Sequence, residues 1–141
     1  MSCTRALGPM PVRCADDAMY LMALAVKRPV EHEVLACLLG PGGRSVDGTV
    51  LSIPHAARPD QVLVVVELCC ELASFQPLAT QVLAASVRPD SGVLPGDVDR
   101  WLEASAMCES VGLQLVEWFV IGPHGFECPR DLLGEPERWS R

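Results

Sequence analysis

The chain has little positive charge and no long apolar run. It contains one lysine, Lys27, and its eleven basic residues face eighteen acidic ones, which gives a formal charge of −7. Clustered Lys and Arg side chains supply most non-specific affinity for nucleic acids, so we expect no nucleic-acid partner. No apolar run approaches the roughly 20 residues that span a bilayer. We therefore expect no membrane partner either.

Several motifs that carry chemistry are also missing. No Gly-x-Gly-x-x-Gly follows a predicted strand, and neither a P-loop nor a Gly-x-Ser-x-Gly elbow is present. The seven cysteines include no Cys-x-x-Cys pair. Those in apolar runs are expected to act as small hydrophobic residues of a reduced, cytoplasmic protein: Cys37, Cys69, Cys70 and Cys108. The apolar run Ala18–Val26 follows acidic residues and precedes Lys27 and Arg28. This order of charges is the reverse of that in a signal peptide.

With 141 residues, half of them hydrophobic, the chain is long enough for one domain with a proper core. We predict a flexible arm over residues 1–14, a domain over 15–134 and a tail over 135–141. We predict a helix that starts near Ala15 and ends before Pro29, because acidic residues stand at its start and apolar residues recur at helical spacing. The apolar runs 33–39 and 44–53, separated by Gly40-Pro41-Gly42-Gly43, predict a β-hairpin.

The second half of the chain alternates helices with strands. Residues 60–73 predict a buried helix capped by Asp60, because the polar positions fall on one helical face. Residues 79–87 predict a buried strand. A turn-rich stretch then leads to Asp97, the expected N-cap of a helix through residue 111, and residues 114–121 predict the strongest strand. This order indicates an α/β sandwich with a mixed sheet.

One ordered set of motifs resembles a known family. Ser86-Val87-Arg88 is followed by seven residues, Gly96, two residues, Asp99 and then ESVGLQLVEWFVIG. This resembles the carboxy half of the JAB/MPN (JAMM) domain of bacterial RadC-like proteins, which carries His-x-His, seven residues, Ser, two residues and Asp. The stretch PVEHEVLACLLGPGGRSV resembles the family's first strand and hairpin, with Glu33 at the general-base position and Glu31 as the off-register alternative.

The resemblance covers residues 15–134 and implies a JAB/MPN-type, cytidine-deaminase-like sandwich with a mixed sheet flanked by helices. In the family, both histidines and the aspartate hold Zn²⁺, and the glutamate takes a proton from the bound water. Here Ser86 and Arg88 replace the histidines, Gly96 replaces the assisting serine, and Asp99 is the only retained ligand-type residue. Serine is a poor zinc ligand and arginine is none. We therefore expect no catalytic residue, metal or other cofactor.

The replacement of histidine by arginine suggests a specific arrangement. We expect the Arg88 guanidinium to stand in for the metal ion by hydrogen bonding to Asp99, within reach of Glu33. The three histidines fall elsewhere and are expected to be solvated or structural: His32, His55 and His124. Cys69 and Cys70 point about 100° apart on one helix, which argues against a cysteine zinc site.

The resemblance implies a catalytically inactive RadC-like JAB/MPN domain that acts as a protein-binding or scaffold module. We expect a protein partner or a homo-oligomer, with Trp139, or Trp101 if it faces outward, as an anchor. The alternative is a zinc-dependent JAMM-type peptidase or isopeptidase with non-standard ligands, which would require zinc. A DNA-associated role is the third candidate and would need a basic patch.

Overall fold

The computed structural model describes residues 3–6, 11–46 and 48–139. At its centre the strands form one mixed sheet in the order β1-β3-β2-β4-β5-β6. In chain order the strands are β1 (Cys3–Ala6), β2 (Glu33–Leu39), β3 (Thr49–Pro54), β4 (Gln81–Val87), β5 (Gln114–Gly122) and β6 (Gly125–Glu127). Among these strands, β4 and β5 run parallel, and the other neighbours pair antiparallel.

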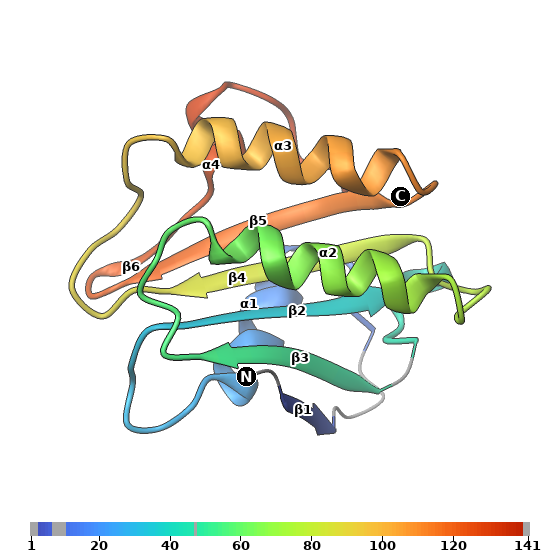
Figure 1. Cartoon of the computed structure of the whole chain (residues 1–141), viewed down its shortest axis with the longest axis horizontal. Coiled ribbons are helices and arrows are strands. Elements are labelled where there is room, and N and C mark those ends of the chain that lie inside the picture. Colours follow the sequence, from blue (N-terminus) through green and yellow to red (C-terminus); the bar gives the residue numbers. More distant parts are fainter. Residues whose placement is uncertain (1–2, 7–10, 47, 140–141) are drawn as a thin grey trace.

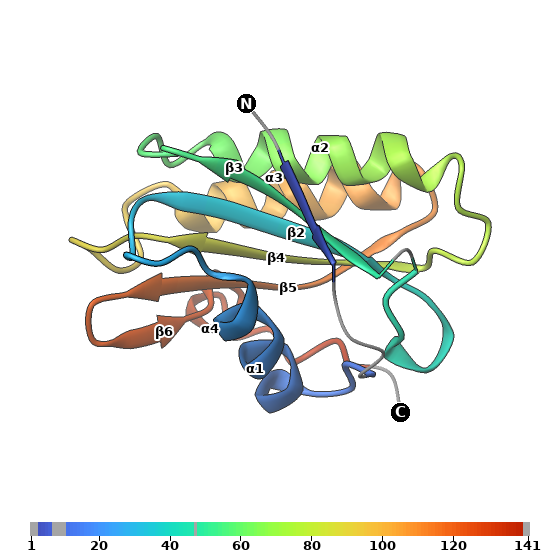
Figure 2. The same ribbon diagram turned by 90° about the horizontal axis from the view of Figure 1, so that it is seen from below.

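Helices cover both faces of the sheet. They are α1 (Ala15–Ala25), α2 (Gln61–Ala73), α3 (Asp97–Glu109) and the short α4 (Pro129–Leu132). Helices α2 and α3 lie side by side over one face (Figure 1), and α1 lies under the other (Figure 2). The predicted α/β architecture, a mixed sheet flanked by helices, is therefore confirmed. Among the described residues, no helix has the length and apolar character needed to cross a membrane.

Two hydrophobic cores lie between the three layers, which are α2 with α3, the sheet, and α1. One core joins α2 and α3 to the sheet, through side chains that include Val66, Trp101 and Trp118. The other joins α1 to the opposite face, through Met22 and Phe119 among others. All positions of β2 and of β4 are buried, because both faces of the central strands are covered. This explains why their sequences are continuous apolar runs without alternation.

The predicted central elements are confirmed, with differences at their ends. Strands β2 and β3 form the expected hairpin, with a 3-10 turn over Pro41–Gly43 between them. Asp60 occupies the N-cap position of α2, but its side chain makes no capping hydrogen bond, since it pairs with Arg58 at 2.9 Å instead. Gly96, with a φ of 90°, is the N-cap of α3, so the expectation that Asp97 caps this helix is wrong.

Parts of the predicted arm and of the predicted tail contact the domain. Within the predicted arm, Cys3–Ala6 forms β1 against β3, and Val12 is buried with its N–H donated to the carbonyl of Gly43. Residues 1–2, 7–10 and 140–141 lie outside the described part of the chain. In the tail, Arg138 lies 4.5 Å from the ring centroid of the fully buried Trp101, and Trp139 is half-buried against the α1 side of the core.

Candidate functional site

The motif positions Ser86 and Arg88 lie together at the carboxyl end of β4. Ser86 is buried, and its hydroxyl oxygen accepts a 2.9 Å hydrogen bond from Nε1 of Trp118 on β5. The Arg88 guanidinium lies 5.9 Å from the centroid of the same indole ring. Because alternate residues of a strand share a face, both side chains point toward the layer of α2 and α3. The serine hydroxyl is therefore engaged by a neighbour inside the core.

The guanidinium of Arg88 binds Asp97 with two hydrogen bonds. Its two terminal nitrogens lie 2.6 Å and 3.1 Å from the two carboxylate oxygens of Asp97, and one of them also donates to the Gly92 carbonyl at 3.1 Å. Both charged side chains are buried, at 5% and 0% exposure. Arg88 does hydrogen-bond to a carboxylate, as we expected, but the expected partner, Asp99, is wrong. Asp99 is exposed on α3, and Asp97 takes its place.

Asp97 collects further donors. Arg100 donates to it at 2.7 Å, and the backbone N–H of Leu94 donates at 2.7 Å. Burial alone would raise the pKa of the Asp97 carboxyl, but the hydrogen bonds from Arg88, Leu94 and Arg100 together hold this pKa below its ordinary value. The carboxylate therefore stays ionised and fixes the loop between β4 and α3 to both elements.

Gly96, at the position of the family's assisting serine, lies at the start of α3. Its φ of 90° favours glycine, and a Cβ atom there would come within 3.1 Å of the Arg100 guanidinium. A side chain at this position would require the Arg100 guanidinium, which contacts Asp97, to shift by a few tenths of an ångström. The backbone conformation at this position therefore favours glycine over the serine that the family has there.

Glu33 lies on the opposite face of the sheet from Ser86 and Arg88. Its register partner on β4 is Val87, which faces the α1 side of the core. The Glu33 carboxylate accepts hydrogen bonds from the Ser52 hydroxyl at 2.6 Å and from the Lys27 N–H at 3.0 Å. The expectation that Arg88 reaches Glu33 is therefore wrong, because the pleat directs neighbouring residues to opposite faces.

Glu31, the off-register alternative to Glu33, also binds other side chains and not Arg88. It accepts a 2.9 Å hydrogen bond from Nζ of Lys27 and lies 3.8 Å from Nδ1 of His55. His32 precedes β2, and its Nε2 lies 3.1 Å from a carboxylate oxygen of Asp90. Among the described residues, no group of three or more His, Cys, Asp or Glu side chains is arranged to hold a metal ion.

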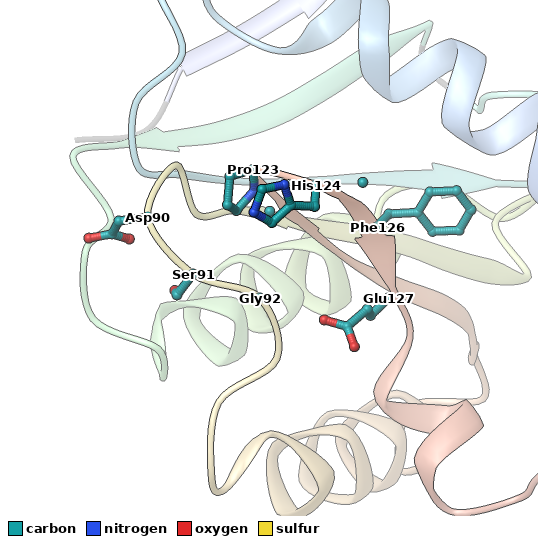
Figure 3. A pocket seen from close by; sticks show the side chains of 9 residues that line it. Asp90, Ser91, Gly92, Pro123, His124, Phe126 and Glu127 are labelled. Atoms are coloured by element: carbon teal, nitrogen blue, oxygen red, sulfur yellow. The ribbon is translucent and has the colours of Figure 1, made fainter.

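A cavity that the sequence did not predict lies beside the ion-pair network of Arg88, Asp97 and Arg100. Its volume is about 360 Å³, and the segments Asp90–Gly92 and Gly122–Glu127 line it (Figure 3). The first segment follows β4 and the second follows β5, so the cavity lies at the carboxyl ends of the two parallel strands. Open α/β sheets commonly bind ligands at this edge. The signal in the sequence was the pair of Gly- and Pro-containing turns that follow the two strands.

The walls of the cavity are closely packed main chain. A Cβ atom on Gly122 would come within 2.7 Å of the Ser91 carbonyl oxygen, so the two segments touch there with no room for a side chain. Glu127 accepts a hydrogen bond from the Val93 N–H at 3.3 Å. Arg88 fixes the same loop through the Gly92 carbonyl. The buried ion pair and the cavity therefore belong to one structural unit.

No protein-family model matches the chain, and no curated protein matches it. The resemblance to JAB/MPN domains consequently rests on the motif spacing and on the order of the elements. The geometry adds an ion-pair network, Arg88, Asp97 and Arg100, that braces a loop beside a cavity. This edge of the sheet is the candidate functional site.

The free cysteines differ in burial, so we expect them to differ in reactivity. Burial raises the pKa of the Cys37 thiol to about 12, and burial likewise raises the pKa values of Cys69 and Cys108. Cys14 is exposed. Because the thiolate is the reactive form, we expect a disulfide reagent such as DTNB to modify Cys14 rapidly and these three buried thiols slowly in the folded protein.

The measurement is the number of rapidly reacting thiols with and without denaturant. A Cys14→Ser variant is expected to lose one equivalent from the fast phase, whereas a Cys37→Ser variant keeps it. Equal fast phases for the wild type and the Cys14→Ser variant would contradict the assignment.

Proposed function

We propose that the protein is a catalytically inactive JAB/MPN-like domain of the RadC type, and that it acts as a protein-binding or scaffold module. The observation that carries this proposal is the bidentate ion pair between Arg88, at a zinc-ligand position of the resemblance, and the buried Asp97. A guanidinium cannot deprotonate to bind a metal, and here it neutralises the buried Asp97 carboxylate.

The order of the elements supports the family assignment. A hairpin, a helix over α2, the strand that carries Ser86 and Arg88, a helix over α3 and a last long strand follow one another as the resemblance requires. Six cysteines are free thiols, which agrees with the proposed cytoplasmic protein: Cys14, Cys37, Cys69, Cys70, Cys108 and Cys128. The excess of acidic residues favours a protein partner or a second copy of the chain over a nucleic acid.

In the alternative, a zinc-dependent hydrolase with non-standard ligands, Glu33 is not positioned as the general base. A general base has to lie within hydrogen-bond reach of the proton that it takes. Glu33 faces away from Ser86 and Arg88, and its carboxylate is already bound to Ser52. A catalytic zinc site also needs about three protein ligands, and within the described part of the chain Asp97 is the one ligand-type side chain hydrogen-bonded to Arg88.

The test is metal content, compared with a variant in which the two histidines are restored. The wild-type protein, purified without chelator and dialysed against Zn²⁺, is expected to retain far less than one zinc ion per chain. The double variant Ser86→His/Arg88→His is expected to bind one zinc ion, because both histidines would face Asp97 from the same side of β4. Zinc is then expected to raise the melting temperature of this variant.

The matched control is Ser86→Asn/Arg88→Gln, which removes the same hydroxyl and guanidinium but adds weaker metal ligands. One zinc ion per wild-type chain, together with hydrolysis of an isopeptide substrate, would overturn the proposed function. A double-histidine variant that folds but binds no zinc would contradict the likeness of this edge to a metal site.

A further inference from the structure

The cavity at the carboxyl ends of β4 and β5 has a distinct chemical character. Its lining residues include two carboxylates, Asp90 and Glu127, one imidazole, that of His124, and neither a lysine nor an arginine. The nearby guanidiniums of Arg88 and Arg100 are both bound to Asp97. A ligand in the cavity would therefore meet negative charge that no lining Lys or Arg side chain offsets.

Glu127 is held in a position to receive a ligand. One of its carboxylate oxygens, Oε1, accepts the hydrogen bond from the Val93 N–H, and this contact fixes the side chain. Figure 3 shows the carboxylate pointing across the cavity toward the segment at Gly92. Asp90 lies on the outer side of that segment, with its carboxylate 73% exposed and 3.1 Å from Nε2 of His32, so Glu127 is the carboxylate that faces the cavity.

The size and rigidity of the cavity limit what fits. A volume of about 360 Å³ is at the lower end of ligand sites, which suits one long side chain and not a nucleotide-sized cofactor. The close contact of Gly122 with the Ser91 carbonyl and the brace from Arg88 to the Gly92 carbonyl mean that the walls are already in place. A preformed site loses less entropy on binding.

We propose that this cavity binds a positively charged side chain, Lys or Arg, of a protein partner, with the cationic group on the Glu127 carboxylate. This inference rests on the proposed function, since it names the chemistry by which the binding module recognises its partner. The net charge of −7 would also attract a basic partner from a distance.

The experiment is a titration of the ¹⁵N-labelled full chain, followed by the backbone amide signals of Gly92, Gly122 and Gly125. The probe is Nα-acetyl-arginine amide, and the matched control is Nα-acetyl-citrulline amide, which has nearly the same shape and no charge. We expect the arginine probe to shift these signals in a saturable way and citrulline to leave them nearly unchanged. Nα-acetyl-lysine amide is expected to act at the same signals.

The variant Glu127→Gln removes the charge but keeps an oxygen that accepts the Val93 N–H. It is expected to weaken binding of the arginine probe by roughly threefold or more, as for the loss of a partly exposed ion pair. Glu109→Gln removes the same charge from the exposed far end of α3 and is expected to change nothing. The loop signals of both free variants are expected to match those of the wild type.

Equal binding of arginine and citrulline, or no loss of affinity in the Glu127→Gln variant, would overturn the proposal. Tighter binding of a free polyamine such as spermidine than of an arginine-containing peptide would also overturn it, because the site would then serve a small molecule. These outcomes leave the proposed lack of catalysis in place, whereas stoichiometric zinc with hydrolysis would remove it whatever the titration gives.

Discussion

Replacing Arg88 with methionine is expected to destabilise the protein by about 3 kcal/mol at neutral pH, near the lower end of the cost of breaking a buried ion pair. Asp97 would remain fully buried and would lose two of its hydrogen bonds. Arg100 and the Leu94 N–H would still donate to it, which keeps the cost from being larger. Urea unfolding, followed by the fluorescence of the buried Trp101 and Trp118, measures the change.

The pH dependence tests whether the ionised carboxylate is the cause. The pKa of Asp97 in the folded protein is lowered, so its contribution is present above the unfolded value of about 3.9 and is lost as the pH falls through the lower folded value. The difference between the wild type and Arg88→Met is therefore expected to shrink at acid pH, where Asp97 is protonated in both proteins.

Arg28 provides the matched control, because it is exposed and its replacement by methionine removes the same charge. This variant is expected to stay within about 0.5 kcal/mol of the wild type. An Arg88→Met variant that is equally close to the wild type at neutral pH would contradict the role assigned to the buried pair. The double variant Arg88→Met/Asp97→Leu is expected to be less destabilised than the sum of its single variants.

The sequence predicted the central elements well, because each has a clear local signal. The apolar runs of β2, β4 and β5 and the Gly- and Pro-rich turns between elements specify strands and their ends. The short β1, β6 and α4 have three or four residues each, and their formation depends on neighbours that are distant in sequence. Such tertiary context is absent from local patterns.

The wrong partner of Arg88 has a geometric cause. Motif spacing brings the first turn of α3 to the end of β4, but it does not specify which acid in that turn faces the strand. Asp97 and Asp99 are two residues apart, which is about 200° around a helix, so only one of them can face inward. With Gly96 as the N-cap, Asp97 is the first residue of the helix, and its carboxylate points back toward Arg88.

The face on which Glu33 lies was also hidden in the sequence. The run EVLACLL of β2 is buried on both sides, so no alternation of polar and apolar residues identifies its faces. Pairing Glu33 with Val87, and Val34 with Ser86, decides the question. A shift of one residue in this register would exchange the faces.

A second buried pair, Glu117 with Arg130, is expected to give an effect of similar size with a different pH signature. The Nε atom of Arg130 donates to Glu117 at 2.8 Å, and both side chains are nearly fully buried. Arg130→Met is expected to cost about 3 to 5 kcal/mol at neutral pH, because it leaves the Glu117 carboxylate buried without a cation. Urea unfolding at several pH values measures this loss.

The pH dependence expected for this pair follows from the direction of the Glu117 pKa shift. Burial raises the pKa of Glu117 and outweighs the opposing contact with Arg130, so the folded protein holds this proton more tightly than the unfolded chain. Stability from this group is present below the unfolded value of about 4.3 and is lost as the pH rises through the raised folded value. Without Arg130 the folded pKa rises further, so the variant is expected to lose stability over a wider range of pH.

The neutral variant Glu117→Gln separates charge from packing. If the buried charge is the cause, the double variant Glu117→Gln/Arg130→Met is expected to be more stable than Arg130→Met alone at pH 7, and its stability no longer falls as Glu117 would ionise. If the two variants unfold at the same urea concentration, lost packing of the arginine stem explains the effect instead. Asp97 stabilises the fold when ionised, whereas Glu117 favours it when protonated, because three donors bind Asp97 and burial dominates at Glu117.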